Sequence, residues 1–265
     1  MTLWGTITVA ASRNRSRTLL AVGGAVVIAL GVSGCGGADA SDAPAEKRAF
    51  PLGGKTLTIE AENASVELVP ADVKDVEVTR RVDGWVFMGT GPDARWKMTD
   101  STLRLAVECD AVASDCTSRN QVKVPRGVAV TVKGDNGSVT ASGFDTALRI
   151  NSDNGSVTVR DSSGPLDLDS DNGAITAEGI SARTVSATSN NGAVRIGLAV
   201  VPDSVDTSTD NGQVTIDLPG SGTSYAVSAS SDNGKVNVDV PTDDSSAHVL
   251  KARTDNGKIT IRSAN

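Results

Sequence analysis

The sequence predicts an all-β chain: a single parallel β-solenoid, or β-helix, of about seven regular coils, preceded by an irregular β cap and a lipoprotein signal peptide. Two observations support this prediction. A triplet of the Asp-Asn-Gly type recurs seven times, with glycine spacings of 18, 18, 19, 20, 22 and 23 residues. The chain also has only three Trp, one Tyr and three Phe, which is few for a compact core but suits stacked repeats filled with aliphatic side chains.

Residues 1–34 have the features of an export signal. Arg13, Arg15 and Arg17 precede an apolar run at residues 19–32, and no acid is present. The run is shorter than the roughly 20 residues that a spanning helix needs, and it ends in Val32-Ser33-Gly34-Cys35, which resembles the bacterial lipobox. We therefore expect a cleaved signal peptide, a lipid on Cys35 that anchors the exported chain at the outer face of the cell membrane, and a flexible tether over residues 35–49. An uncleaved anchor or an ordinary signal peptide is the alternative.

Residues 50–127 are expected to form the irregular β cap. Stretches with strand character occur at residues 56–61, 65–69, 76–81, 102–107 and 121–124, and Glu62-Asn63-Ala64 resembles a degenerate copy of the triplet. Cys109 and Cys116 are close enough in sequence to close a small loop, so we expect a disulfide in an oxidising compartment. A metal-binding or redox pair is the alternative, although the spacing fits neither usual pattern.

Residues 128–265 are expected to form the regular coils. An aliphatic residue stands six positions before each triplet asparagine: Val130, Leu148, Leu166, Val185, Val205, Val227 and Leu250. Another stands three positions after it: Val139, Val157, Ile175, Val194, Val214, Val236 and Ile259. The segment after each glycine alternates with period two, as a β-strand does. Asn-Gly supports positive φ angles in a hairpin turn or in a corner between two strands of one coil; we favour the corner, because a stack demands the same geometry in every copy.

The turn residues form two columns along the expected stack: Asn136, Gly137, Asn154, Gly155, Asn172, Gly173, Asn191, Gly192, Asn211, Gly212, Asn233, Gly234, Asn256 and Gly257. We expect the asparagines to form a hydrogen-bonded ladder. Aspartates at the same spacing repel by about 1 kcal/mol per pair in water, so we expect them to face solvent, cap their own turns or share cations.

Three features together resemble the actinobacterial lipoproteins of the putative-adhesin, β-strand-repeat family, over residues 50–262. They are the Asp-Asn-Gly-x-Val/Ile units, the Cys109 and Cys116 pair, and Val124-Pro125-Arg126-Gly127-Val128 before the first regular coil. The resemblance implies a β-solenoid on the cell surface, and it carries no active-site motif over to this chain.

Catalysis finds little support, and no cofactor is expected. The single histidine, His248, begins an expected strand, and no GxSxG motif is present. Gly53-Gly54-Lys55-Thr56 is expected to be a turn, because Ala49 stands where a phosphate loop needs glycine. The weak candidates for a cation site are Asp153, Asp171, Asp210, Asp232 and Asp255, with Asp167 and Asp169 nearby, since hard cations prefer oxygen ligands. Turn chemistry explains the same aspartates without a metal.

Charge and exposed features restrict the partners. Without the three leader arginines the chain has 22 basic and 32 acidic residues, a formal charge of −10, which argues against nucleic acid. Trp85, Phe87 and Trp96 are expected either to recognise a glycan or peptide or to close the end of the stack. The C-terminal coil is expected to expose an edge strand for self-association or for another envelope protein. We expect a non-enzymatic, lipid-anchored surface adhesin or interaction scaffold; a cation- or glycan-binding module is the alternative.

Overall fold

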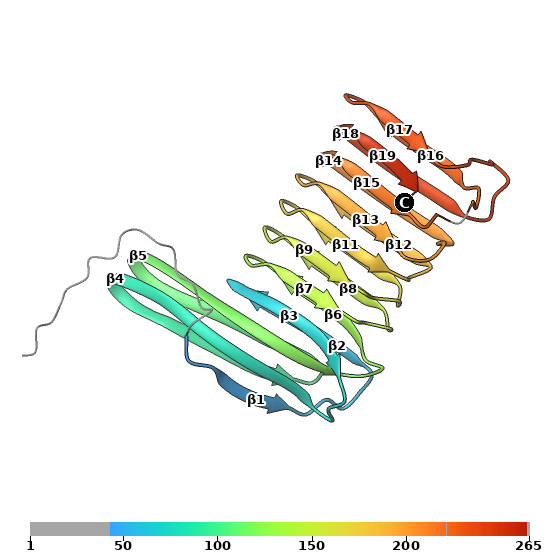
Figure 1. Ribbon diagram of the computed structural model, residues 1–265. Helices are drawn as coiled ribbons and strands as arrows, with labels where there is room; N and C mark the ends of the chain where they lie inside the picture. Colours follow the sequence, from blue (N-terminus) through green and yellow to red (C-terminus); the bar gives the residue numbers. More distant parts are fainter. Residues whose placement is uncertain (1–42, 221, 264–265) are drawn as a thin grey trace, which may run out of the picture. The chain divides into compact units, whose positions relative to one another are not determined.

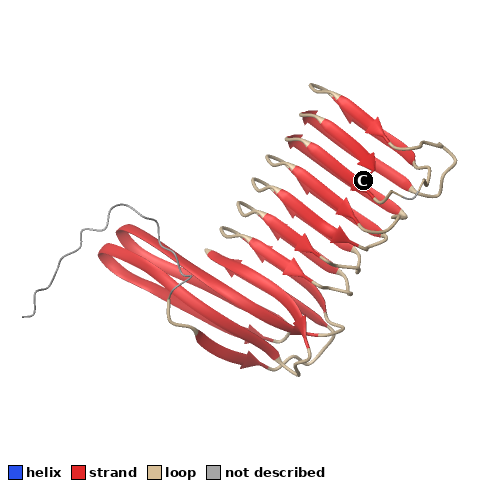
Figure 2. Ribbon diagram, viewed as in Figure 1, coloured by secondary structure: helices blue, strands red, loops and turns tan. Residues whose placement is uncertain are grey.

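The computed structural model describes residues 43–220 and 222–263, which form β-strands joined by turns and loops (Figures 1 and 2). The expected signal peptide and Cys35 lie outside the described residues. In the described part of the chain, no helix is long and apolar enough to cross a membrane. Five strands precede the regular repeats: β1 (Glu46–Phe50), β2 (Thr56–Glu62), β3 (Ala64–Ala71), β4 (Val76–Thr99) and β5 (Thr102–Pro125). The expected tether is therefore too long at its C-terminal end, because residues 46–49 belong to β1, which pairs with β4.

The regular part consists of seven coils, numbered in sequence order, each with one strand on either side of its triplet. They are coil 1, β6 (Ala129–Gly134) and β7 (Val139–Ser142); coil 2, β8 (Leu148–Ser152) and β9 (Val157–Arg160); coil 3, β10 (Leu166–Ser170) and β11 (Ile175–Ile180); coil 4, β12 (Thr184–Ser189) and β13 (Val194–Leu198); coil 5, β14 (Ser204–Asn211) and β15 (Val214–Leu218); coil 6, β16 (Ala226–Ser231) and β17 (Val236–Asp239); and coil 7, β18 (Val249–Asn256) and β19 (Ile259–Ser263).

Each strand pairs in parallel with the equivalent strands of neighbouring coils. Leu166, for example, lies opposite Leu148 on one side and Val185 on the other. The two strands of a coil therefore belong to different faces of the stack, and the triplet between them forms a corner. The prediction of an all-β parallel solenoid is confirmed.

The core is the stacked inner sides of these strands. One continuous cluster of buried side chains runs from Phe50 to Ile261. Both aliphatic columns lie in it except in coil 6, where Val227 is only partly buried and Val236 is exposed. Each added coil contributes a few Val, Ile, Leu and Ala side chains to one narrow cross-section, which explains why so few aromatic residues are needed.

The coils do not follow one another in sequence order along the stack. Strand β18 pairs with β14 on one side and β16 on the other, and β19 lies between β15 and β17 in the same way (Figure 1). Coil 7 is thus inserted between coils 5 and 6. The expectation that the C-terminal coil forms the exposed edge is wrong, because coil 6 occupies that end.

Side-chain size and charge account for the insertion. Leu250, Ile259 and Ile261 of coil 7 are fully buried, whereas the large apolar side chains that coil 6 leaves exposed are the smaller Val236 and Val238, at 42% and 36%. The register also places Arg262 of coil 7 between Asp217 of coil 5 and Asp239 of coil 6. Sequence order would bring those two carboxylates together, which costs free energy.

The cap continues the coils and then departs from them. Strands β2 and β3 flank Asn63 and pair in register with β6 and β7, so they form one more coil. The two ends of β5 pair with β2 and β3, while residues 107–117 extend beyond the stack. Strand β4 pairs antiparallel with β5 over both halves, and β1 pairs antiparallel with β4. The result is a long two-stranded ribbon that folds back on itself, with its tip at the bend of β4 and β5 in Figure 1.

Candidate functional site

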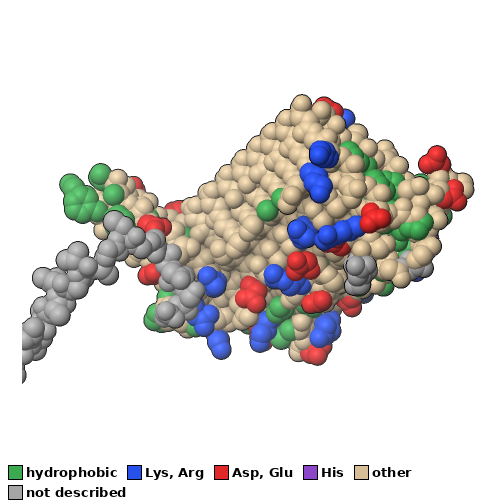
Figure 3. Space-filling model, turned by 45° about the horizontal axis from the view of Figure 1, so that its top comes forward, with side chains coloured by type: hydrophobic (Ala, Val, Ile, Leu, Met, Phe, Trp, Pro, Cys, Tyr) green, Lys and Arg blue, Asp and Glu red, His purple; other side chains and the backbone are tan. Residues whose placement is uncertain are grey.

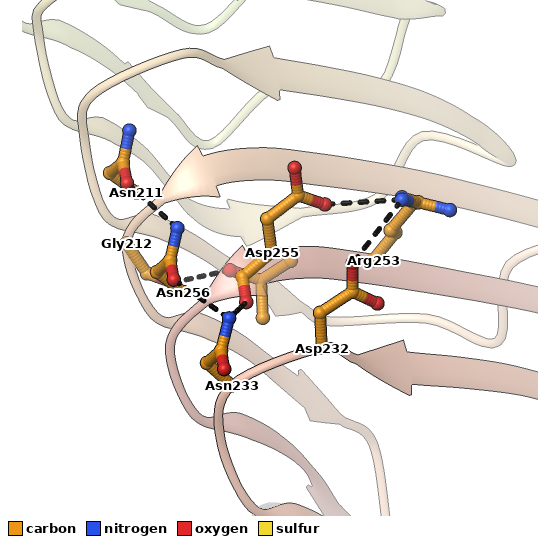
Figure 4. A network of polar contacts seen from close by, with 8 residues as sticks. Asn211, Gly212, Asp232, Asn233, Arg253, Asp255 and Asn256 are labelled. Atoms are coloured by element: carbon orange, nitrogen blue, oxygen red, sulfur yellow. Dashed lines mark hydrogen bonds and ion pairs between the residues drawn. The ribbon is translucent and has the colours of Figure 1, made fainter.

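The corner edge of the stack carries an unbroken ladder of asparagine side chains. Each Asn donates an amide hydrogen to the side-chain oxygen of the Asn in the adjacent coil: Asn136 to Asn63 (3.1 Å), Asn154 to Asn136 (2.9 Å), Asn172 to Asn154 (3.0 Å), Asn191 to Asn172 (3.1 Å), Asn211 to Asn191 (3.0 Å), Asn256 to Asn211 (3.0 Å) and Asn233 to Asn256 (3.0 Å). Figure 4 shows its last three members, in which Asn256 of the inserted coil bridges Asn211 and Asn233. These amides bind one another and leave little for a ligand.

The triplet glycines are required by close backbone approach. A Cβ atom on Gly173 would overlap the carbonyl oxygen of Gly155 in the neighbouring coil, and the same overlap recurs at Gly155, Gly192, Gly212, Gly234 and Gly257. Among the seven triplet glycines, only Gly137 has a positive φ in the range that side chains disfavour. The triplet glycines are therefore needed because they allow neighbouring coils to approach closely. The positive φ expected from the Asn-Gly sequence is not the general reason why glycine occupies these positions.

A third column at this edge was not predicted. The residue before each triplet has a hydroxyl in coils 2 to 7: Ser152, Ser170, Ser189, Thr209, Ser231 and Thr254. Ser189 donates to the Gly173 carbonyl at 3.0 Å, and Thr254 donates to the Gly212 carbonyl at 2.9 Å. Five of these residues are buried, and Ser231 is partly buried. The hydroxyls of coils 3 to 7 donate to a glycine carbonyl of an adjacent coil, whereas Ser152 donates to Gly155 of its own coil. The signal in the sequence was the recurring Ser or Thr at a fixed offset from the triplet.

The aspartate column faces water along the same edge. Asp153, Asp171, Asp210 and Asp232 are exposed, and Asp255 is partly exposed. Coil 4 has Asn190 in this column, and its amide donates to Asp171 at 3.0 Å. Arg253 lies 3.1 Å from Asp255 and 3.9 Å from Asp232 (Figure 4). Local partners thus reduce the repulsion between neighbouring carboxylates at two places.

No metal site is formed by the described residues: residues 43–220 and 222–263 contain no group of three or more His, Cys, Asp or Glu side chains that could hold an ion. A concentration of negative charge does occur on β10. Burial raises the pKa of Asp169, and the carboxylates of Asp171 and Asp167 raise it further. Cation binding by the aspartate column remains an untested prediction.

The three aromatic residues Trp85, Phe87 and Trp96 lie in two different surroundings in the ribbon. Trp96 packs edge-on against Phe50, with ring centroids 6.1 Å apart, and Arg80 lies over its ring at 4.1 Å, so it joins the core. Trp85 and Phe87 are exposed, together with Met88 and Val112. Hydrophobic side chains gather at one extremity of the molecule in Figure 3. Trp96 thus helps close the stack, whereas Trp85 and Phe87 do not.

Cys109 and Cys116 form a disulfide within the ribbon. In the antiparallel register Cys116 lies opposite Gly84, and a Cβ at Gly84 would come within 2.9 Å of the Cys116 sulfur. Position 84 must therefore stay small for the two strands to pair beside the disulfide. The bond links the outgoing and returning parts of β5 next to the exposed aromatic residues.

The remaining sequence candidates have structural roles. The Nδ1 atom of His248 lies 2.7 Å from the Pro202 carbonyl oxygen, and its ring packs edge-on against Tyr225. Gly53 and Gly54 lie in the connection between β1 and β2. A shallow groove of about 480 Å³ runs across the first residues of β2, β6, β8 and β10, and the Arg149–Asp167 ion pair lies along it.

Comparison with known proteins identifies the family. The family model Toastrack DUF4097 matches residues 97–262, well over half of the chain. The chain belongs to the Toastrack family. The match spans the return of the ribbon and all seven coils, so it supports the β-strand-repeat resemblance drawn from the motifs. No curated protein matches the sequence.

Three solved structures are similar to this Toastrack chain in fold only. One is a putative adhesin from Parabacteroides distasonis ATCC 8503, with a TM-score of 0.44, 16% identity, and coverage of 84% of this chain and 98% of that one. A putative adhesin from Bacteroides fragilis NCTC 9343 has a TM-score of 0.41, 15% identity, and coverage of 83% and 97%. A putative cell adhesion protein from Clostridium sporogenes ATCC 15579 has a TM-score of 0.38, 12% identity, and coverage of 83% and 99%.

Proposed function

We propose that this Toastrack protein is a non-enzymatic scaffold of the cell envelope, held at the outer face of the membrane by a lipid on Cys35. The observation that carries the anchor is the cysteine placed directly after a basic segment and a short apolar run. The scaffold role is supported by the corner edge, where asparagine, glycine and hydroxyl side chains serve contacts between coils. Such a stack is a stiff body suited to hold other surfaces in place.

Lipidation is tested by expressing the full chain in a bacterium that processes lipoproteins. We expect the wild type in the membrane fraction, with an N-terminal peptide that begins at acylated Cys35. Cys35→Ala should lose the acyl mass, whereas the matched variant Cys109→Ser/Cys116→Ser should keep it. A mature wild-type chain without acyl mass would refute the anchor.

We propose in addition that coil 6 is a surface for self-association. Among the described strands β17 pairs only with β19, and the Lys235 carbonyl accepts from Ile259 of β19. In a strand, backbone groups of alternate residues point to opposite sides, so those of Val236 and Val238 point outward. Strand β16 is less open, because the backbone of residues 241–243 bonds with Tyr225 at its start.

A second copy of β17 fits this edge in antiparallel register. Centred on Asn237, the pairing places Val236 opposite Val238 of the other copy, and Lys235 opposite Asp239. Opposite charges directly across an antiparallel pair are favourable, and like charges are not. Lys235→Asp should therefore weaken the dimer and Lys235→Asp/Asp239→Lys should restore it, both measured by sedimentation equilibrium. A monomeric wild type, or a double variant as weak as the single one, would contradict this pairing.

A further inference from the structure

The free end of the β4–β5 ribbon carries an apolar surface that the coils do not use. Trp85, Phe87, Met88 and Val112, which we name the tip patch, are 51%, 59%, 72% and 78% exposed. Phe87 lies opposite Ala113 and Gly89 opposite Ala111, so Met88 and Val112 lie beside Phe87 at the tip, and Trp85 stands two residues before Phe87, opposite Asp115. Four large apolar side chains at one exposed end indicate a contact with another apolar phase or molecule.

The register of β1 shows which way the preceding chain leaves. Strand β1 is antiparallel to β4, with Glu46 opposite Arg80 and Phe50 opposite Val76. The N-terminal end of β1 is therefore its end nearest the tip. The Glu46 carboxylate binds the Arg80 guanidinium at 2.5 Å, and Arg80 also donates to the Ala94 carbonyl at 2.9 Å. These bonds fix the point from which the tether starts.

The tether is long enough to bring Cys35 level with the tip patch. Phe87 is seven residues beyond Arg80 along β4, a rise of about 23 Å. Ten residues lie between Cys35 and Glu46, and the eleven steps from one to the other span at most about 40 Å when fully extended. A membrane that holds the lipid of Cys35 can therefore meet the tip patch without any change in the ribbon.

We propose that the tip patch inserts into the surface of the lipid bilayer that holds Cys35, as a second contact that orients the ribbon. This inference rests on the proposed lipid anchor. Trp and Phe favour the boundary between headgroups and acyl chains. The patch members are uncharged, so the contact is apolar in origin and requires no anionic headgroups.

Tryptophan fluorescence of the lipidated full chain in phosphatidylcholine vesicles tests the contact. Trp4 is removed with the signal peptide, so Trp96→Phe leaves Trp85 as the probe in the lipidated chain, and the matched Trp85→Phe leaves Trp96, which packs against Phe50. We expect Trp85 emission to shift to the blue in vesicles and to fall by at least about two-fold with bromine on the lipid acyl chains. Trp96 emission should be the same with and without bromine.

Vesicle flotation separates the two proposals. If the chain floats but iodide quenches Trp85 as strongly as it does without lipid, the lipid anchor stands and the tip contact is overturned. A chain that does not float overturns both. Phe87→Ser/Met88→Ser, combined with the Trp85 probe, should float normally and lose the bromine quenching. A blue shift that appears without vesicles and grows with protein concentration would assign the patch to a second copy and overturn the membrane contact.

Discussion

At the scale of single residues, the members of the triplet have different tasks at the same corner. Glycine allows neighbouring backbones to approach, asparagine joins them through its side-chain amide, and aspartate faces water beside them. The hydroxyl before the triplet completes the corner by donating to a glycine carbonyl. The sequence predicts the role of the asparagine column, whereas for the aspartates it leaves solvent exposure, turn capping and shared cations as alternatives. The role of glycine was misjudged because positive φ is its commoner use in an Asn-Gly sequence.

A methyl group at one triplet glycine should destabilise the chain. In Gly173→Ala the new Cβ meets the Gly155 carbonyl, so the coils must separate locally. We expect a loss of about 1–3 kcal/mol in the free energy of unfolding, the usual cost of overpacking. Denaturant unfolding measures it. Gly53→Ala is the control, because a Cβ at Gly53 meets no atom within 4 Å; equal losses in the two variants would contradict the close approach.

Removing the charge of Asp169 should stabilise the chain at neutral pH. Burial and the carboxylates of Asp171 and Asp167 raise the Asp169 pKa. The folded state therefore holds the Asp169 proton more tightly than the unfolded state does. The stability that this proton contributes is fully present below the unfolded pKa of about 3.9, and it is lost as the pH rises through the folded pKa. Asp169→Asn should gain a fraction of a kcal/mol at pH 7, because the side chain is only partly buried and water screens its charge.

The pH dependence of this gain is the measurement that checks it. Denaturant unfolding of Asp169→Asn and of the wild type should converge as the pH falls from 7 toward 4. Asp206→Asn is the matched control, because Asp206 lies in register with Lys251 and its charge is favourable there. A gain at Asp169 that stays constant with pH would argue against a raised pKa.

At the scale of strands and coils, the sequence predicts what lies in each coil but not which coils are neighbours. Each repeat has the same inner aliphatic pattern, so any coil fits beside any other by that criterion. Neighbours are selected by side-chain size at the open end and by the outer charges, such as Asp217 beside Arg262. These features become informative only once the register is known.

Reversing the charge of Arg262 should weaken the insertion of coil 7. Its Nε donates to Asp217 at 2.6 Å, and Asp239 lies on the other side in register. Arg262→Asp would align three carboxylates, so we expect a loss of about 1–2 kcal/mol and faster hydrogen exchange at the Ile259 amide. Lys258→Asp makes the same change of charge one residue before the paired positions Val214, Ile259 and Val236, where the preceding residues are Gln213 and Lys235 and the change should cost nothing. Equal losses in both variants would contradict the explanation by charge.

The ribbon was the least predictable element. The sequence indicates strands at residues 76–81 and 102–107, where apolar and polar residues alternate, but the structure extends them into β4 and β5 of 24 residues each. Gly84, Gly89, Gly91 and Pro92 resemble loop residues in the sequence. Their strand conformation depends on pairing between the two halves of the ribbon, which a local pattern cannot show.

At the scale of the whole molecule, the described chain is one stack in which each coil contacts only its neighbours, with one core and one asparagine ladder. In such an arrangement stability depends on the contacts between adjacent coils. The ladder runs through the inserted coil without a break, so the same corner geometry serves any order of coils. This explains how the triplet can recur regularly while the order of the coils departs from the sequence.

Disulfide trapping between engineered cysteines tests the in-register stack and its order most directly. Ser208 lies opposite Arg253, and Arg253 lies opposite Ser230. Paired strands bring such Cα atoms within disulfide range, whereas two strand spacings, about 10 Å, do not. We predict by peptide mass spectrometry that Ser208→Cys/Arg253→Cys and Ser230→Cys/Arg253→Cys form bonds and that Ser208→Cys/Ser230→Cys does not. Coils in sequence order would bond the last pair and not the first, and that result would contradict the insertion of coil 7.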